Sequence, residues 1–219
     1  MLTVHHLNNS RSQRVLWLLE ELGVPYEIVK YERDPKTSLA PAELQKIHPL
    51  GKAPIVTDDG NTLAESAVIL EYIVEKYGAG KLVPPKDTPN YRRYRYFMHY
   101  AEGSLMPFLL LKLITSRMRR APFLVRPIAK KIASTVDGAF VGPNLERHIA
   151  FIDSELGKSD FFAGGELSAA DIQMSFPLEA IAARVPNAPE RIKQFVNRIH
   201  ERPAYKRALE RGGPYDVMS

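Results

Sequence analysis

Apolar and polar positions at the start of the chain predict a strand, a helix and a second strand. Residues 2–7 are apolar enough for a strand, and residues 26–31 are rich in aromatic and β-branched side chains. Between them, Val15, Leu16, Leu18, Leu19 and Leu22 follow helical spacing, and Gly23 and Pro25 mark the end of the helix. This order predicts a βαβ unit with parallel strands.

The stretch from His48 to Ile73 predicts a hairpin followed by a helix. After a polar loop with a short helical turn at 35–45, a strand begins at Ile55 and ends in an Asp-Asp-Gly turn of the kind that closes hairpins. Residues 62–64 predict the returning strand. The apolar positions that follow, with helical spacing, are Ala67, Ile69, Leu70, Ile73 and Val74. We expect Thr62 and Glu65 to form a capping box at the start of this helix.

Strand alternation disappears after residue 78, and the helical period dominates the rest of the chain. Residues 78–89 hold two glycines and three prolines, which is typical of a linker. The spacing then predicts helices over 91–118, broken or bent near Pro107, and over 122–136, 144–157, 169–183, 192–200 and 204–210. Ser168 and Asp171 form an S-x-x-D pattern, which predicts a capping box with a structural role.

Composition excludes several kinds of chemistry. The chain contains no cysteine, so it has neither disulfides nor thiolate metal sites, and no protein thiol takes part in a reaction. The histidines at 5, 6 and 99 lack metal-ligand spacing, and we expect no metal. Any thiol chemistry therefore needs a thiol that arrives with the substrate.

Charge and hydropathy narrow the partners and the compartment. The net charge is +5, but the basic residues fall in small groups on predicted helices, which favours solvated faces and small anions over nucleic acid. No apolar run approaches the roughly 20 residues that a membrane span needs, and the first residues do not resemble a signal peptide. We therefore expect a cytoplasmic protein without nucleic-acid or membrane partners.

Two predicted helix starts are candidate binding sites because unpaired backbone N–H groups there favour anions. At Glu65 and Ser66, the corner suits a small carboxylate, although a plain capped helix explains the same residues. At the first helix, Ser10 and Gln13 fit an S-x-x-Q capping box. A hydroxyl has one hydrogen and two acceptor sites, so Ser10 can cap the helix and still donate to a ligand.

The stretch 48–73, the S-R-x-x-R pattern of residues 10–14 and the S-x-x-D helix together resemble the glutathione transferases over nearly the full length. The likeness is to the serine-type, bacterial and fungal branch, since no tyrosine precedes residue 26. It implies an α/β thioredoxin-like domain at 1–78, a linker at 79–89 and an all-helical domain at 90–219. It also implies a homodimer.

The resemblance assigns a site residue by residue. Ser10 would be catalytic and contact the glutathione thiol, with Ser12 as the alternative. Pro54 would follow a cis peptide bond, and the Ala53 backbone would pair with the cysteinyl backbone. The remaining implied glutathione contacts are Glu65 and Ser66 for the γ-glutamyl group, Lys52 for the glycyl carboxylate, and Arg11. Lys52 also fits an ordinary surface lysine. Glutathione would be the co-substrate, without a further cofactor.

The second substrate would lie between the Ser10 loop and the long helix. Tyr96, Tyr100 and Ser104 recur at four-residue spacing and form a candidate pocket face for an electrophile. We assign the neighbouring stripe to the core: Tyr94, Phe97, Met98, Ala101 and Leu105.

The implied reaction is attack of the glutathione thiolate on an electrophilic substrate. Two alternatives stay open at this stage. Reduction of organic hydroperoxides would use the same site, and a non-catalytic relative would bind glutathione without turnover or would not bind it at all.

Overall fold

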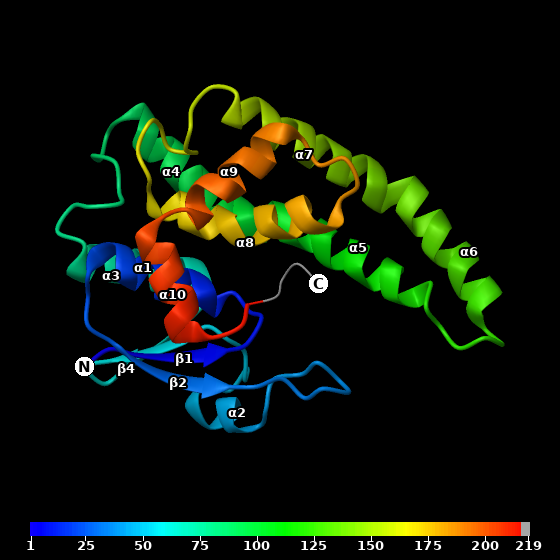
Figure 1. Cartoon of the computed structure of the whole chain (residues 1–219), viewed down its shortest axis with the longest axis horizontal. Coiled ribbons are helices and arrows are strands. Elements are labelled where there is room, and N and C mark those ends of the chain that lie inside the picture. Colours follow the sequence, from blue (N-terminus) through cyan, green and yellow to red (C-terminus); the bar gives the residue numbers. More distant parts are fainter. Residues whose placement is uncertain (216–219) are drawn as a thin grey trace.

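A four-stranded sheet organises the N-terminal part of the chain in the computed structural model, which describes residues 1–215 (Figure 1). Its strands are β1 (Thr3–Leu7), β2 (Glu27–Tyr31), β3 (Ile55–Asp58) and β4 (Asn61–Ala64). They lie in the order β2-β1-β3-β4. β1 and β2 are parallel, with Val4 opposite Ile28, whereas β3 is antiparallel to both β1 and β4. The predicted parallel βαβ unit and hairpin are confirmed.

Helices cover both faces of this sheet. They are α1 (Ser12–Leu22), α2 (Glu43–Ile47) and α3 (Ser66–Tyr77). Val4, Leu16 and Ile69 belong to the core on the α1 and α3 side, while Leu7, Leu44 and Ile55 form a smaller core under α2. Two faces are filled because successive strand residues point to opposite sides. α1 ends where predicted, since Gly23 adopts φ 67° and its N–H donates to the Leu19 carbonyl.

Two predicted capping boxes in this domain are wrong. Thr62 lies within β4, opposite Thr57, so hairpin pairing holds it in an extended conformation away from the helix start. α3 begins only at Ser66, after Glu65 with φ 71°. At α1, the N-cap residue is Arg11, and the side-chain amide of Gln13 contacts no partner within residues 1–215.

The C-terminal part is helical, as predicted. Its α-helices are α4 (Pro89–Tyr100), α5 (Met106–Met118), α6 (Arg126–Val136), α7 (Gly142–Leu156), α8 (Ala169–Arg184), α9 (Glu190–His200) and α10 (Pro203–Gly212). The predicted cap of α8 is present: Ser168 donates through its N–H and hydroxyl to Asp171, which also accepts the Phe162 N–H.

Two π-helical turns join pairs of these helices. η1 (Ala101–Leu105) connects α4 to α5, and η2 (Asp137–Val141) connects α6 to α7. Each turn ends just before a proline, Pro107 or Pro143, whose missing N–H interrupts the regular hydrogen-bond ladder. The irregularity predicted near Pro107 is therefore a π-helical turn. The expected break between 136 and 144 is wrong, because η2 carries the helix through.

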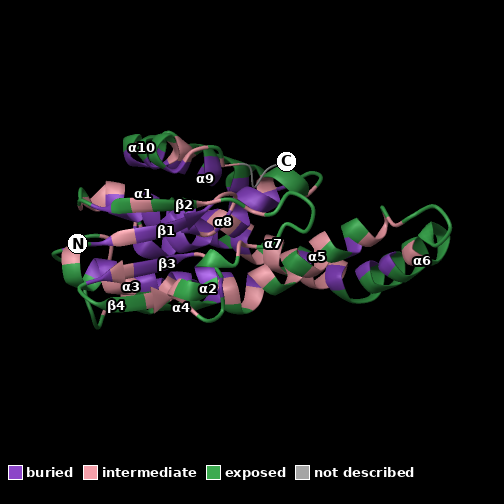
Figure 2. Ribbon diagram, turned by 90° about the horizontal axis from the view of Figure 1, so that it is seen from below, coloured by how far each residue is buried: buried purple, intermediate pink, exposed green. Residues whose placement is uncertain are grey.

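The two parts pack against each other over a continuous core. α10 lies along α1, where the Trp17 and Tyr205 rings meet edge to face with centroids 5.3 Å apart. Arg202 forms a salt bridge with Glu21 at the same contact. α8 is buried between α1, α3 and α4, which fixes the N-terminal domain against the helices. By contrast, α5 and α6 project beyond the body of the molecule (Figures 1 and 2).

Candidate functional site

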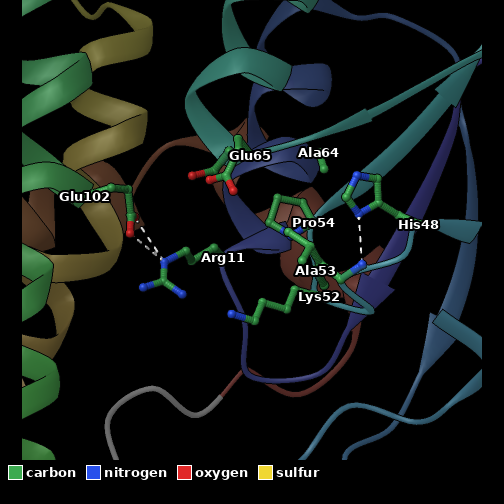
Figure 3. A pocket seen from close by; sticks show the side chains of 10 residues that line it. Arg11, His48, Lys52, Ala53, Pro54, Ala64, Glu65 and Glu102 are labelled. Atoms are coloured by element: carbon green, nitrogen blue, oxygen red, sulfur yellow. Dashed lines mark hydrogen bonds and ion pairs between the residues drawn. The ribbon is translucent and has the colours of Figure 1, made fainter. Parts of the chain in front are cut away.

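A cavity of about 210 Å³ opens where the N-terminal domain meets the η1 turn (Figure 3). Its wall comes from the N-terminus of α1, the segment before β3, the N-terminus of α3 and η1. The lining residues are Arg11, His48, Leu50, Lys52, Ala53, Pro54, Ala64, Glu65, Ser66 and Glu102. All six residues predicted as glutathione contacts are among them. The fold thus brings together residues separated by up to 91 positions in the sequence, from Arg11 to Glu102.

The segment before β3 forms one wall of the cavity. The Ala53–Pro54 peptide bond is cis, as the resemblance implies. Glu65 stands across the opening from Lys52 in Figure 3, so an acidic and a basic group lie at separate ends of the same space. This arrangement suits a ligand with an amine at one end and a carboxylate at the other.

Ser66 is the first residue of α3, where backbone N–H groups lack helical partners. Its hydroxyl oxygen accepts hydrogen bonds from Arg14 Nη1 at 3.2 Å and from Gln173 Nε2 at 3.3 Å. Both acceptor positions of the oxygen are therefore occupied, which leaves the hydroxyl hydrogen to donate into the cavity. Together with the helix N-terminus, this hydroxyl is suited to a carboxylate.

Glu102 links the two domains beside the cavity. Its carboxylate accepts from Arg14 Nη1 at 2.6 Å and from Arg11 Nε at 2.9–3.0 Å. Burial opposes ionisation of Glu102, but the Arg14 and Arg11 charges outweigh it and hold the pKa below the ordinary value. The Phe176 ring lies 5.4 Å from each guanidinium carbon, a cation–π distance. Two cations against one anion leave this wall positive.

Arg14 is charged but lies buried in the protein interior. Its side chain is 1% exposed, and its Nε and Nη2 contact no acceptor within the described residues. Burial lowers the pKa of Arg14, while Glu102 raises it in opposition. A guanidinium remains protonated in proteins, so the site keeps this positive charge.

Ser10 lies in the loop before α1 and is not among the residues that line the cavity, although the next residue, Arg11, is. Ser10 is 4% exposed. Its Oγ accepts the Ser12 N–H at 3.2 Å and lies 2.7 Å from the Ser12 Oγ. Ser12 is fully buried, and its hydroxyl also contacts His6 Nδ1 at 2.9 Å and the Leu7 backbone. The structure thus joins the two candidate serines in one hydrogen-bonded chain that ends at His6.

His6 is neutral at physiological pH. Burial, and secondarily the charge of Lys30, lower the pKa of His6 to about 4. A neutral imidazole carries one hydrogen. When that hydrogen is on Nδ1, His6 donates to Ser12, and Ser12 can direct its single hydrogen to Ser10 at 2.7 Å in place of the Leu7 carbonyl at 3.3 Å. The Ser10 hydrogen is then available to a ligand.

The predicted electrophile face lies elsewhere. Tyr96, Tyr100 and Ser104 line a shallow depression of about 520 Å³ along α4 and η1, together with Arg92, Arg95, His99 and Gly103. None of these residues lines the first cavity, which Glu102 reaches from the same helix. The Tyr100 hydroxyl lies 2.6 Å from His148 Nδ1. The predicted core stripe is confirmed, because all five of its members are buried.

Sequence reasoning missed Glu102, His48, Leu50 and Ala64 in the cavity wall. Glu102 carried no local signal, since its partners Arg11 and Arg14 lie 91 and 88 positions away. Within residues 1–215, no group of three or more His, Cys, Asp or Glu could hold a metal ion. Nor is any helix of the described chain long and apolar enough to cross a membrane.

Comparison with known proteins relates both halves to one family. The model of the glutathione S-transferase N-terminal domain matches residues 1–75, and the model of the C-terminal domain matches residues 121–203. Glutathione S-transferase 3 of Schizosaccharomyces pombe is 37% identical over 96% of this chain and 88% of its own length. Glutathione S-transferase 1 of Saccharomyces cerevisiae is 34% identical over 96% of this chain and 95% of its own.

Solved structures agree at the level of the fold. A glutathione S-transferase from Actinobacillus pleuropneumoniae superimposes with a TM-score of 0.81 at 28% identity, covering 99% of this chain and 95% of that one. A sphingomonad glutathione S-transferase solved in complex with glutathione gives 0.73 at 24% identity, covering 96% and 98%. At 24% identity, the similarity to the sphingomonad structure supports only the fold.

Proposed function

This chain belongs to the glutathione S-transferase family, and from this premise we propose that it activates the thiol of glutathione for attack on electrophilic substrates. One observation carries the proposal: a single cavity gathers Lys52, the Ala53–Pro54 segment, Glu65 and Ser66. Membership alone fixes neither a ligand nor a site. The cavity supplies groups that match both ends of the tripeptide.

Glutathione is oriented by its two ends. The Ser66 hydroxyl and the α3 N-terminus receive the γ-glutamyl carboxylate, and Glu65 pairs with the γ-glutamyl amine. The Ala53 backbone pairs with the cysteinyl backbone. Lys52 pairs with the glycyl carboxylate, and Arg11 adds positive charge that attracts the negatively charged tripeptide. Because the wall is positive and largely prebuilt, little rearrangement is needed on binding.

Ser10 donates its hydroxyl hydrogen to the glutathione sulfur and favours the thiolate. A free thiol with pKa near 8.5 is only about 3% ionised at pH 7, so complete ionisation gains at most about 30-fold. Because nucleophilicity falls with pKa, the net gain is smaller. Holding both reactants in contact supplies the remainder of the acceleration. Binding residues therefore matter as much as Ser10.

We assign the thiol contact to Ser10 rather than Ser12. Ser12 is fully buried, and its hydroxyl already contacts His6, Leu7 and Ser10. Within residues 1–215, Ser12 is the only residue that hydrogen-bonds to the Ser10 hydroxyl, and Ser10 adjoins Arg11 of the cavity wall. Ser12 then acts behind Ser10, as the group that accepts from His6 and donates to Ser10.

The wider organisation follows from family membership. We propose a cytoplasmic homodimer with a thioredoxin-like domain at 1–78, a linker at 79–89 and a helical domain at 90–219. The depression formed by Tyr96, Tyr100 and Ser104 is proposed as the surface for the second substrate, since Gly103 and Ser104 of its lining directly follow Glu102 of the glutathione cavity. Sedimentation of the purified protein measures the subunit number directly.

Calorimetric titration with glutathione tests the proposal, followed by turnover of an aryl halide. We expect saturable heat, a raised melting temperature and conjugate formation. Heat without conjugation of any aryl halide, alkyl halide or enone would point to a binding protein without catalysis. Neither heat nor a thermal shift would refute the assignment of the cavity.

A further inference from the structure

Helices α5 and α6 and their connection form an arm, residues 106–136, that extends away from the rest of the molecule (Figure 1). The sheet lies at the opposite end of the molecule from the outer part of the arm, whereas the cavity lies near the base of the arm, since Glu102 of its wall belongs to the η1 turn that leads into α5. Figure 2 shows most of α6 and of the connection as exposed. The proposed function leaves the outer part of the arm without a role.

Charge is distributed unevenly between the arm and the rest of the chain. The arm contains seven Lys and Arg residues and no Asp or Glu. The rest of the chain has 23 Lys and Arg against 25 Asp and Glu, a net charge of −2. The positive charge of the whole protein therefore originates in the arm.

Most of these cations lack an acidic partner. Lys112 and Arg119 form salt bridges with Asp137, the residue that follows α6. The other five, for which residues 1–215 provide no salt bridge, are Arg117, Arg120, Arg126, Lys130 and Lys131. All five side chains are exposed. They give the outer half of the arm a field that attracts anions.

Apolar side chains stand among these cations at the outermost point. Phe123 and Leu124 in the connection are 80% and 88% exposed. Along α6, an exposed apolar stripe with four-residue spacing continues from them: Ile128, Ile132 and Val136. Large apolar side chains that are exposed close together on a folded protein indicate an interaction surface. Exposed apolar residues within a cationic surround are typical of peripheral membrane contact.

We propose that the tip of the arm, residues 117–132, binds the surface of an anionic phospholipid bilayer. Phe123 and Leu124 enter the boundary between headgroups and acyl chains, while the five unpaired cations contact lipid phosphates. This is peripheral contact and needs no spanning helix. It replaces the sequence-based expectation that the protein has no membrane partner. It does not depend on the proposed chemistry.

Two other anionic or apolar partners match the tip less well. A second copy of the chain has a net charge of −2 outside its own arm, which provides little complementary charge for the five unpaired cations. Nucleic acid would neutralise the cations but would leave Phe123 and Leu124 in water. A bilayer of anionic lipid satisfies both the charge and the apolar tip.

Co-sedimentation of the full chain with vesicles tests the proposal. Vesicles of phosphatidylcholine mixed with phosphatidylglycerol should retain the protein, pure phosphatidylcholine vesicles should retain little, and added salt should release it because screening weakens surface charge contacts. The double variant Phe123→Ser/Leu124→Ser should reduce the bound fraction about tenfold or more. Its control is Leu39→Ser, another exposed leucine outside the arm.

A second pair of variants isolates charge. Lys130→Ala/Lys131→Ala should weaken binding to anionic vesicles, whereas Lys193→Ala/Lys206→Ala on α9 and α10 should not, although both remove two exposed cations. Equal binding to both vesicle types, or unchanged binding of the tip variants, would overturn the proposal. So would a lower sedimentation mass of the Phe123/Leu124 variant, since the tip would then be a subunit interface. Retention of duplex DNA without vesicle binding would assign the arm to nucleic acid instead.

Discussion

Arg14 Nη1 donates to Glu102 Oε1 over 2.6 Å and thereby joins the first helix of the sheet domain to the long helix of the second domain. The same nitrogen donates to the Ser66 hydroxyl, so the buried Arg14 both joins the two domains and positions a hydroxyl of the cavity. The proposed glutathione site is therefore built by the interface as well as by the thioredoxin-like domain.

Glu102→Gln should destabilise the protein because it leaves the buried Arg14 without its counter-charge. We expect the free energy of unfolding to fall by about 1–3 kcal/mol, measured by urea denaturation. Asp153→Asn provides the control, since its salt bridge with Arg191 is exposed and should contribute less than about 1 kcal/mol. A loss no larger than that of the control would show that Glu102 does not stabilise the interface.

Ser66→Ala should weaken glutathione binding by removing the hydrogen that Arg14 and Gln173 leave free to donate. We expect the Kd for glutathione to rise about tenfold, the cost of one charge-assisted hydrogen bond. Ser154→Ala, an exposed serine on α7, is the control in the same calorimetric titration. An unchanged Kd in Ser66→Ala would remove this hydroxyl from the binding site.

His6 variants test the direction of the hydrogen-bonded chain behind Ser10. Asn places an N–H donor close to the position of Nδ1, so His6→Asn should keep the bound thiol pKa near that of the unmodified protein. His6→Leu has no donor and should raise the pKa by roughly one unit. The neighbouring His5→Asn is the control, because His5 contacts Tyr31 and not the serines. Equal thiol pKa values in the Leu and Asn variants would contradict the chain.

Stability should depend on pH through His6. Its pKa is lowered to about 4 from 6.5, so the unfolded state binds the proton first as pH falls. The stabilisation is complete above pH 6.5 and is lost as pH falls toward 4, by about 3 kcal/mol in all. Compared with His6→Asn, the unmodified protein should lose more unfolding free energy over this window. The difference in unfolding free energy between the two proteins cancels the titration of all other groups. Parallel plots of unfolding free energy against pH would contradict the lowered pKa of His6.

Periodicity in the sequence predicted most of the fold because burial follows it. The α1 stripe and its stop at Gly23, the parallel β1 and β2, and the core stripe around Phe97 all follow from local spacing. The sequence-based predictions failed where a contact between residues distant in the sequence determines the local structure. Thr62 has a capping pattern, but pairing with Thr57 places it in a strand.

The candidate site was predictable where residues belong to a motif of the family, which includes Arg11 in the S-R-x-x-R pattern. Residues 52–54 and 65–66 lie close together in the chain and were found through the resemblance. Glu102 reaches the cavity only because α4 and η1 pack beside α1, and no short-range pattern contains that information. The four-residue spacing of Tyr96, Tyr100 and Ser104 correctly predicted that these residues share one surface. It could not predict that this surface is separate from the cavity lined by Ser66 and Lys52.

The pKa of the glutathione thiol in the bound state, followed by the ultraviolet absorbance of the thiolate, tests the central claim most directly. In the unmodified protein it should lie clearly below the free value of about 8.5. In Ser10→Ala it should return toward that value, with conjugation of an aryl halide at least about tenfold slower. The fold should stay intact by circular dichroism. A bound thiol at its free pKa, or a Ser10→Ala variant with the same pKa and turnover as the unmodified protein, would contradict the account.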